Sequence, residues 1–478
     1  MEAEPPVATA CPPRHGGQAS AEGAAATRQQ ASEPPVATAG DRYLFRVCHP
    51  RDGIMKKVHL AYGKTGLDVK VPADAVVIQP KYVPGLPDEQ AALIDALRKP
   101  IASLPLGKLV QAGQRVAVVH TDITRATPNE RILPPLLAEL EAGGIRREDI
   151  ILLNALGTHR PQTDAELKAM LGEKIAANYR CLQHDGHNDS SLVHVGRTRF
   201  GHDVRVNRHF MEADVRILTG FIEPHFFAGF SGGPKGVLPS IAGAESVLDN
   251  HGAKMIGHPQ ATWGITRGNP IWEEMLEAAS MTRPTFLLNV TMNRDKRITG
   301  VFAGSMPEAH AAGCAFVKSA AMVPVREPFD VVITSNSGYP LDLNLYQSVK
   351  GMSAAAQVVR QGGSIIIASQ CWDGVPEFGE FGRLLRSATG PAEILARIES
   401  PGFGCMDQWQ VQTQARIQQK ATIYVHADGL TEEQIRECTL EPCPRIEETL
   451  NNLLARGEGR RQTVCVLPEG PLTIPYVE

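Results

Sequence analysis

Three side chains that can do chemistry lie close together in the middle of the sequence. His225, Lys235 and His251 all fall within the stretch FIEPHFFAGFSGGPKGVLPSIAGAESVLDNH. The glycines of SGGPKG lack Cβ atoms, so the backbone around Lys235 can approach a ligand closely, and a phosphate would suit it. A glycine follows Lys235, which excludes a Walker A loop. Taken alone, the segment also fits a glycine-rich turn with a solvated lysine.

A second group of polar residues follows an apolar segment earlier in the chain. The run 116–120 leads into TDITRATPN, which contains Asp122, Thr124 and Arg125. A strand that ends in these residues, with a helix starting soon after Thr127, brings a capping hydroxyl, free amides and a guanidinium together. That combination suits a phosphate or a carboxylate. A helix cap beside a surface Arg–Asp pair explains the same residues equally well.

Histidines follow two of the apolar segments. His159 comes after 149–156, and His225 comes after 215–222. A single histidine in such a place is more often packed or hydrogen-bonded than catalytic. Two of them at equivalent strand ends indicate a shared crevice, because the carboxyl ends of parallel strands meet at one edge of a sheet. Later in the chain, Lys350 in YQSVKG either binds an anion across a cleft or is a solvated lysine.

Short apolar segments alternate with helical patterns, and these elements must position the polar residues. Strands are expected at 115–120, 149–156, 215–222, 285–290, 330–334, 363–369, 421–426 and 462–467, and helices at 87–97, 129–141, 163–171, 271–280, 307–321, 352–361, 392–399, 431–437 and 446–454. An early hairpin is expected at 58–71. Pro134 and Pro135 are expected to delay the start of their helix. The pattern predicts an α/β fold, with two α/β domains, largely parallel sheets and an interdomain active-site cleft.

Composition indicates where the domains begin and end. Residues 1–40 are mostly Ala, Pro, Gly, Ser and Gln, which predicts a disordered low-complexity tail, with ordered structure beginning near Asp41. A tract with two prolines at 323–328 marks the expected boundary between the next two domains. We therefore expect an N-terminal cofactor-binding and catalytic domain at 41–325. A C-terminal α/β domain at 326–478 would contribute substrate-binding residues.

Charge and cysteine content narrow the class of protein. The 48 Lys and Arg residues nearly balance 52 Asp and Glu without a basic stripe, so we expect neither nucleic acid nor a membrane as a partner. The nine cysteines are scattered and include no C-x-x-C pair, which argues against a disulfide framework and a zinc cluster. No apolar run reaches membrane-spanning length, and no signal peptide is evident at the N-terminus. The expected location is cytoplasmic.

With these motifs together, the chain resembles the lactate racemase family, the nickel-pincer nucleotide enzymes that racemise or epimerise 2-hydroxy acids. The motifs DITRATP, GTHRP, EPHFFAGFSGGPKGVLPSIAG, DNH, GNP and YQSVK occur in the family's order. The resemblance covers the chain from Asp41 onward. The chain departs from the family at Ser240, where glycine is more usual, and in its N-terminal extension.

The resemblance implies a cofactor, the nickel-pincer nucleotide, which is a nickel complex of pyridinium-3,5-bisthiocarboxylic acid mononucleotide. Lys235 matches the lysine to which the cofactor is attached covalently, and His251 matches the histidine that binds nickel. An imidazole is a sensible ligand for square-planar nickel. Other positions expected to contact the cofactor are Asp122, Thr124, Gly232 and Gly233. Proteins that synthesise the cofactor are implied partners.

The resemblance also assigns the remaining residues. His159 and His225 match the catalytic acid/base histidines, and a racemase needs a base for either enantiomer. Arg125, Gln347 and Lys350 match positions that hold the substrate, and a guanidinium with an ammonium suits a carboxylate. The function implied is inversion at C2 of a 2-hydroxy acid by hydride transfer to and from the cofactor. Lactate, larger hydroxy acids and sugar acids are all possible substrates.

Two other functions fit parts of the pattern. A nicotinamide-dependent 2-hydroxy-acid oxidoreductase would use similar substrates, but no G-x-G-x-x-G follows the early strands. A non-catalytic phospholigand-binding protein would explain the loop around Lys235 but not the paired histidines. Trp409 is either a wall for the side chain of the substrate or a core residue.

Overall fold

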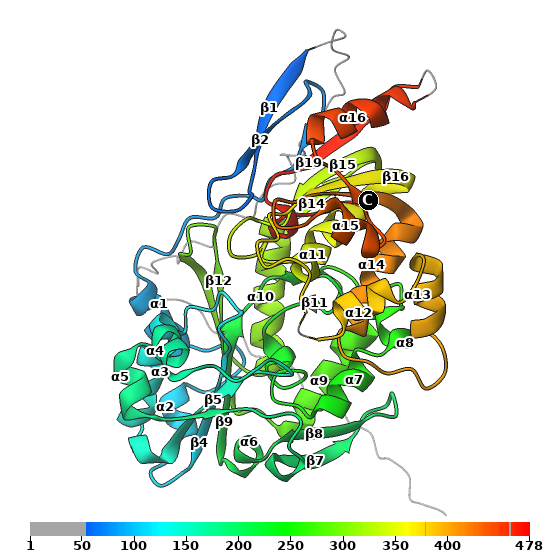
Figure 1. Cartoon of the computed structure of the whole chain (residues 1–478). Coiled ribbons are helices and arrows are strands. Elements are labelled where there is room, and N and C mark those ends of the chain that lie inside the picture. Colours follow the sequence, from blue (N-terminus) through cyan, green and yellow to red (C-terminus); the bar gives the residue numbers. More distant parts are fainter. Residues whose placement is uncertain (1–53, 378, 458–459) are drawn as a thin grey trace, which may run out of the picture. The chain divides into compact units, whose positions relative to one another are not determined.

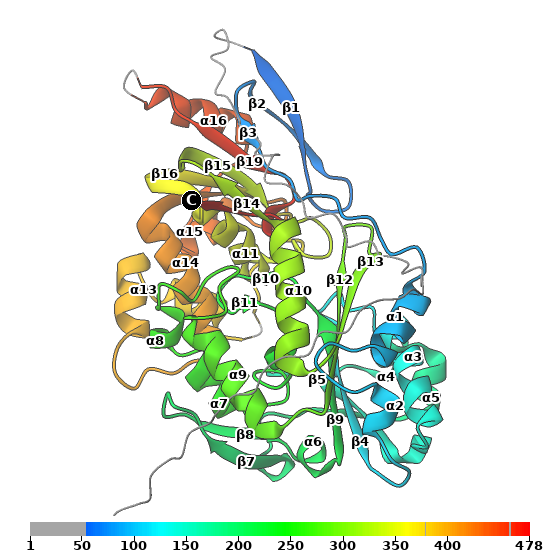
Figure 2. The ribbon, with the colours of Figure 1, turned by 180° about the vertical axis from the view of Figure 1, so that it is seen from behind.

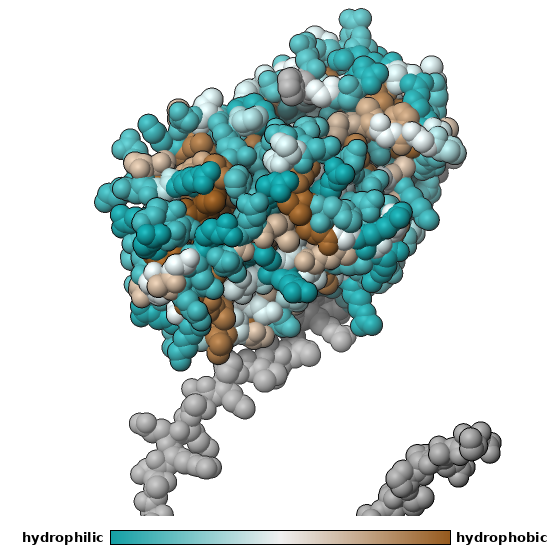
Figure 3. All heavy atoms as spheres, turned by 90° about the horizontal axis from the view of Figure 1, so that it is seen from below, coloured by the Kyte–Doolittle hydropathy of each residue, from teal (hydrophilic) through white to brown (hydrophobic). Residues whose placement is uncertain are grey.

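The computed structural model describes residues 54–377, 379–457 and 460–478 (Figure 1). The tail expected at 1–40 and the ordered start expected near Asp41 lie outside these residues. Within them the chain forms two six-stranded sheets with helices around them, which confirms the expected α/β class. No helix in this described part is long and apolar enough to cross a membrane. The face seen in Figure 3 is mostly hydrophilic, with apolar residues only in small groups.

The first sheet is largely parallel and buried on both faces. Its spatial order is β13 (Ile298–Gly304), β12 (Phe286–Met292), β9 (Val215–Phe221), β4 (Val116–Thr121), β5 (Ile150–Ala155), β6 (Arg180–Gln183). Only β13 is antiparallel to its neighbour. Along β4, Val116 and Val118 belong to one buried cluster, whereas Ala117 and Val119 belong to another. Both faces of this strand are therefore covered, which is why its segment is continuously apolar.

Helices supply both of these buried clusters. The cluster around Val118 includes residues of α1 (Glu89–Arg98), α2 (Leu106–Leu109), α3 (Asn129–Ala142), α4 (Asp164–Leu171) and α5 (Glu173–Asn178). The cluster around Val119 includes residues of α9 (Pro270–Thr282) and α10 (Met306–Ala321). α10 packs along β12 and β13, as the view from behind shows (Figure 2). The first sheet thus has the three-layer arrangement of α/β proteins.

The second sheet is parallel throughout. Its spatial order is β18 (Glu441–Pro442), β17 (Ala421–His426), β16 (Val359–Ala368), β15 (Phe329–Ser335), β19 (Val464–Leu467), β3 (Val76–Val77). Its helices are α11 (Leu345–Ala356), α12 (Phe381–Arg386), α13 (Pro391–Ile398), α14 (Gln408–Lys420), α15 (Glu432–Glu437) and α16 (Ile446–Ala455). Both sheets belong to the same compact unit of the chain.

One edge of the second sheet comes from the beginning of the described chain. The expected early hairpin is present as β1 (Met55–Leu60) and β2 (Leu67–Pro72), which pair antiparallel. Val58 and Val69 of this hairpin pack in one cluster with Val331 and Ile366 of the second sheet. β3 follows the hairpin and pairs with β19. Residues that precede the first sheet in sequence therefore complete the second.

Several small elements accompany the two sheets. β7 (Leu192–Arg197) and β8 (Asp203–Asn207) form a hairpin, β10 (Pro224–His225) pairs with β11 (Gly229–Phe230), and β14 (Met322–Val325) pairs with β20 (Ile474–Val477). Three short helices are α6 (Arg208–Glu212), α7 (Ala244–Asn250) and α8 (Ala253–Ile256). The 3₁₀ turns are η1 (Arg147–Asp149), η2 (Asp189–Ser191), η3 (Gly233–Gly236) and η4 (Gly470–Leu472).

Two expectations about helices were wrong. Pro134 and Pro135 do not delay α3, which begins at Asn129 and contains both prolines, because its buried apolar face holds it in place despite the missing donors. The helix expected at 352–361 begins seven residues earlier, at Leu345. The side chain of Asn344 caps α11 by accepting a hydrogen bond from the backbone N–H of Gln347 at 3.1 Å. α11 ends at Ala356, and β16 occupies the last part of the expected helix.

Candidate active site

Each sheet has a central strand at which the order of the strands changes direction. In the first sheet, β5 and β6 lie on one side of β4, and β9 and β12 lie on the other. In the second sheet, β15 is flanked by β16 and β17 on one side and by β19 and β3 on the other. Such switch points leave a crevice at the carboxyl ends of the strands, where ligands of open α/β sheets bind.

One cavity is lined by residues from both crevices. Its volume is about 290 Å³. It is lined by Arg125 after β4, His225 after β9, Asn336 after β15 and Glu469 after β19. The two switch points therefore open into the same space, which makes this cavity the candidate active site.

Asp122 and His159 form a hydrogen-bonded pair beside this cavity. Asp122 directly follows β4 and is buried, whereas His159 follows β5 and is 43% exposed. Nδ1 of His159 lies 2.5 Å from Oδ2 of Asp122, and the hydroxyl of Thr124 donates to Oδ1 at 2.7 Å. Burial raises the pKa of Asp122, but the hydrogen bond from His159 and the charges of His159 and Arg125 outweigh it, and the net pKa is lowered. Because an ionised carboxylate only accepts, Nδ1 of His159 carries the proton that is donated to Asp122, and Nε2 is the ring nitrogen left for a substrate.

His225 has the opposite arrangement of ring nitrogens. It lies in β10, immediately after β9, and packs on Phe226 and Phe227 with ring centroids 4.9 Å and 4.5 Å away. The backbone N–H of Ala228 donates to Nδ1 of His225 at 3.3 Å, so the proton of the neutral ring belongs to Nε2. Burial lowers the pKa of His225 well below its usual value, and the charge of Lys235 lowers it further. The ring is therefore neutral at physiological pH.

Lys235 lies in η3, on a loop that needs glycine at two positions. Gly232 and Gly233 have φ angles of 74° and 52°. A Cβ atom at Gly233 would lie 2.4 Å from the ring of His310, and the N–H of Gly233 donates to the side chain of Asn289 at 2.8 Å. These glycines thus allow close approach to protein atoms, and among the described residues they do not line the cavity. Their effect is to shape the loop that carries Lys235.

The amine of Lys235 is in an environment that favours its neutral form. Its Nζ lies 5.6 Å from the centre of the Phe227 ring. Burial lowers the pKa of Lys235 well below its ordinary value, and the charges of Arg125 and Lys350 lower it further. A lysine whose pKa is depressed in this way can act as a nucleophile, because its nitrogen has a free lone pair.

His251 has an unused ring nitrogen. It follows α7, is 4% exposed, and contacts the rings of Phe227 and Trp409 at centroid distances of 5.0 Å and 5.2 Å. Its Nδ1 is buried without a hydrogen-bond partner among the described residues. Burial, followed by the charge of Lys235, lowers its pKa to about 3. A neutral imidazole with an unpartnered buried nitrogen is suited to bind a metal ion.

The expected substrate-binding residues line the same cavity from both sheets. Arg125 enters from the loop after β4, and Gln347 and Lys350 enter from α11. Gln347 and Lys350 are three residues apart and therefore lie on the same side of the helix. Burial, followed by the charge of Arg125, lowers the pKa of Lys350 to about 8. Two nearby cations with no carboxylate bonded to them in the described chain form a site for an anion.

Glu223 also lines the cavity, although the sequence did not single it out. This residue lies between β9 and β10 and lines the cavity with Arg125 and Lys350. Burial raises the pKa of its carboxyl, and the charges of Lys350, Arg125 and Lys235 only partly oppose that shift. The available signal was its position two residues before His225 at the end of an apolar strand.

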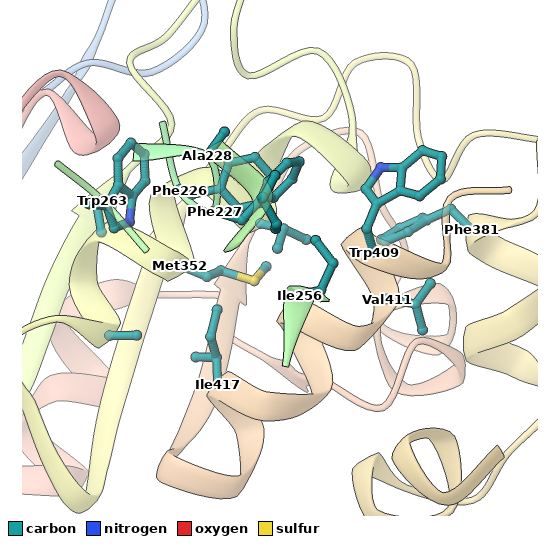
Figure 4. Packing of buried hydrophobic residues seen from close by; sticks show 14 of the residues in the cluster. Phe226, Phe227, Ala228, Ile256, Trp263, Met352, Phe381, Trp409, Val411 and Ile417 are labelled. Atoms are coloured by element: carbon teal, nitrogen blue, oxygen red, sulfur yellow. The ribbon is translucent and has the colours of Figure 1, made fainter. Parts of the chain in front are cut away.

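Trp409 is a core residue that also touches the site. It lies on α14, is 7% exposed, and its indole N–H donates to the hydroxyl of Tyr346 at 3.2 Å. Figure 4 shows it beside Phe381 in the apolar cluster that also holds Phe226 and Phe227. Its ring meets His251, and its burial confirms the interpretation as a core residue. The other interpretation, a wall for the side chain of the substrate, stays a prediction.

Comparisons with known families and proteins agree across most of the chain. Residues 62–264 match the lactate racemase N-terminal domain, and residues 325–474 match the lactate racemase C-terminal domain. A lactate racemase of Thermoanaerobacterium thermosaccharolyticum is 35% identical over 403 residues, which cover 83% of this chain and 94% of that protein. A lactate racemase of Lactiplantibacillus plantarum is 38% identical over 384 residues, covering 80% of this chain and 90% of that protein.

Two solved structures superimpose on most of the chain. The lactate racemase apoprotein of T. thermosaccharolyticum superimposes with a TM-score of 0.82 at 34% identity, covering 88% of this chain and all of that one. A Thermotoga maritima protein superimposes with a TM-score of 0.63 at 19% identity, covering 83% of this chain and 100% of the other. The second likeness concerns the fold alone.

Proposed function

The chain belongs to the lactate racemase family, a family of isomerases, and from that premise we propose that it inverts the C2 centre of a 2-hydroxy acid. Lactate is the first candidate substrate, and larger hydroxy acids or sugar acids are further candidates. The observation that carries this proposal is the pair of histidines with opposite hydrogen bonds at Nδ1: His159 donates there to Asp122, and His225 accepts there from Ala228. A racemase needs proton acceptors and donors on both sides of its substrate.

The residues present fit the cofactor that the family resemblance implies. Lys235, with its depressed pKa, would form the covalent attachment of the nickel-pincer nucleotide, and the free nitrogen of His251 would bind nickel. Asp122 and Thr124 would line the bound nucleotide, and Gly232 and Gly233 would hold the loop open for it. Among the described residues, no three His, Cys, Asp or Glu side chains gather as a metal site, so the other nickel ligands would come from the nucleotide. When bound, this group supplies a hydride acceptor and donor for C2 of the substrate.

The side chains of the protein would bind the substrate and move its proton. Arg125 and Lys350, with Gln347 beside them, hold the carboxylate. Nε2 of His159 accepts the proton of the C2 hydroxyl, and the carboxylate of Asp122 stabilises the imidazolium that results. His225 donates its Nε2 proton in a hydrogen bond to the same oxygen. For His225 to act as the base, its proton must move to Nδ1, and the 3.3 Å hydrogen bond that this atom accepts from Ala228 is then lost.

The division of labour between the two halves of the chain is part of the same proposal. Residues 41–325 would bind the cofactor and carry both histidines, and residues 326–478 would contribute Gln347 and Lys350. Proteins that synthesise the cofactor would be required partners, and the cytoplasm would be the site of action.

Production of the protein beside a cofactor-synthesising system tests the proposal. We expect a nucleotide-sized mass increase on the peptide that contains Lys235 and about one nickel per chain. The loaded protein should convert L-lactate or a larger L-2-hydroxy acid into a mixture of enantiomers, which chiral chromatography measures. Lys235→Ala should show none of the three. A loaded protein that inverts no 2-hydroxy acid would overturn the proposed function.

A further inference from the structure

The candidate cavity extends well beyond the residues that would hold a hydroxy-acid head group. Its lining also includes the apolar residues Phe316 and Val317 of α10 and residues of the loop between β12 and β13. Lys81, Tyr82, Arg294 and Lys296 line it as well, and we term these four residues the outer rim. The cavity is therefore lined by a second group of cations in addition to Arg125 and Lys350, and by apolar residues of α10.

Hydrogen bonds fix the outer rim in place. The segment around Lys81 crosses the end of α10, where the N–H of Lys81 donates to the carbonyl of Ala320 at 3.1 Å. The hydroxyl of Tyr82 donates to Asp295 at 2.9 Å, and the side-chain amide of Asn293 donates to the carbonyl of Val83 at 2.9 Å. The rim thus joins a segment near the beginning of the described chain to the β12–β13 turn.

The charges of the rim are only partly neutralised. Arg294 pairs with Glu469 at 3.2 Å, and the carboxylate of Asp295 accepts from Tyr82. No carboxylate in the described residues lies in an ion pair with Lys81 or Lys296. Two ammonium groups of the rim are therefore free to meet an anion.

The backbone at Lys296 supports a functional reason for its charge. Lys296 has a φ of 58°, in the left-handed region, and its N–H donates to the carbonyl of Asn293 at 3.0 Å within the β12–β13 turn. Glycine is the residue favoured at this kind of turn position, because a Cβ atom is unfavourable there. Strain of this sort is often kept where a side chain is used.

We propose that the outer rim binds a second anionic group of the substrate, so that the preferred substrate is a 2-hydroxy acid with an apolar chain ending in a carboxylate. This inference rests on the proposed function and specifies its substrate class. The C2 carboxylate lies at Arg125 and Lys350, the chain lies against α10, and the distal carboxylate reaches Lys81 and Lys296. Lactate leaves the apolar residues of α10 and the rim unused.

The test compares pairs of acids of equal length. The loaded enzyme is given 2-hydroxyglutarate and 2-hydroxyadipate, and, as matched monoacids, 2-hydroxypentanoate and 2-hydroxyhexanoate. We expect kcat/KM for the diacid to exceed that for its matched monoacid by about fivefold or more, and the ratio to fall as salt is added, because exposed ion pairs are screened. Lys81→Gln combined with Lys296→Gly should bring the ratio close to one.

Lys296→Gly and a control variant separate binding from stability. Glycine relieves the left-handed backbone, so the thermal midpoint of Lys296→Gly should not fall, while the diacid preference does. Arg283 also has a left-handed backbone, with a φ of 48°, but lies at the end of α9 and does not line the cavity. Arg283→Gly should leave the diacid preference unchanged.

Each remaining outcome is decisive. Inversion of lactate and monoacids with no preference for diacids would overturn the rim proposal and leave the proposed function standing. Inversion of no hydroxy acid would remove the proposed function itself. A loss of nickel or of the Lys235 adduct in the rim variant, with the diacid preference kept, would overturn the rim proposal and assign the rim to the phosphate of the nucleotide.

Discussion

Asp122 is the residue on which the tautomer of His159 depends. Its carboxylate accepts the Nδ1 proton and leaves Nε2 free to act as the base. In Asp122→Asn the amide can donate to Nδ1, which would place the proton on Nε2. We expect kcat for hydroxy-acid inversion to fall about 10²–10⁴-fold, the range of general base catalysis, in a loaded enzyme with unchanged nickel content.

Thr124→Val is the matched control for that substitution. It removes the hydroxyl that donates to Oδ1 of Asp122 at 2.7 Å but keeps the carboxylate. Its kcat should fall by no more than roughly tenfold, the loss of one hydrogen bond. If Asp122→Asn retained the activity of the parent enzyme, the pairing of Asp122 with His159 would have no part in proton transfer.

Lys350 should set the alkaline limit of substrate binding. Its pKa is lowered to about 8, so the ammonium is charged below that pH and neutral above it. Because the charged form would hold the carboxylate in the proposed function, kcat/KM should fall roughly tenfold per pH unit above about pH 8. Lys350→Arg should abolish this decline, since a guanidinium stays protonated. A decline at the same pH in both enzymes would place the titrating group elsewhere.

The sequence located most of the candidate residues but not how they meet. His159 and His225 were both expected at strand ends, and His225 does line the cavity. Asp122 and His159 are 37 residues apart, and only the adjacency of β4 and β5 brings them into contact. Glu223 was missed because its one local signal, a place at the end of an apolar strand two residues before His225, does not distinguish it from a solvated carboxylate. Its importance comes from cations that folding brings from α11 and the β4 loop.

At the scale of elements, the N-cap of α11 connects stability to substrate binding. Asn344 accepts from the N–H of Gln347, and Gln347 and Lys350 project from the first turns of this helix. Asn344→Ala should cost about 1 kcal/mol of unfolding free energy and raise KM, because the helix start that carries both residues frays.

Asp88→Ala provides a control of the same kind at another helix. Asp88 caps α1 by accepting from the N–H of Ala91 at 2.9 Å, and α1 does not line the cavity. The free energy of unfolding of Asp88→Ala should fall by an amount similar to that of Asn344→Ala, whereas its KM should stay unchanged. Equal KM values for both cap variants would show that α11 holds its side chains independently of its cap.

Elements with local signals were predicted, and elements defined by distant partners were not. The apolar runs of β4, β5 and β9 and the capping box of Thr163 at α4 are properties of neighbouring residues. β3 has only two residues and exists because β19 offers it a free edge. The antiparallel direction of β13 likewise depends on where the chain turns after β12.

For the molecule as a whole, buried neutral histidines should set its sensitivity to acid. Burial lowers the pKa of His120 and of His310 to about 4. Between the unfolded value of about 6.5 and pH 4 the unfolded chain binds more protons, so stability falls with falling pH, by up to about 3 kcal/mol per histidine. His310→Gln, which keeps a donor for the carbonyl of Ser231, should reduce this loss in urea unfolding.

The control for that measurement is an exposed histidine. His187 lies on the surface, and His187→Gln should leave the pH dependence of unfolding as it is in the parent protein. If His310→Gln were equally without effect, protonation of His310 would not contribute to acid unfolding.

The place of β3 in the second sheet has a consequence for synthesis on the ribosome. β3 and the hairpin before it are made before the first sheet, but their partner β19 leaves the exit tunnel only after that sheet. At ~5–20 residues per second the early strands wait on the order of tens of seconds for their edge. Vectorial folding can complete the first sheet in that time, whereas the second must await the synthesis of β19. A nascent chain released before Val464 would expose apolar strands, and chaperones and proteases should recognise it.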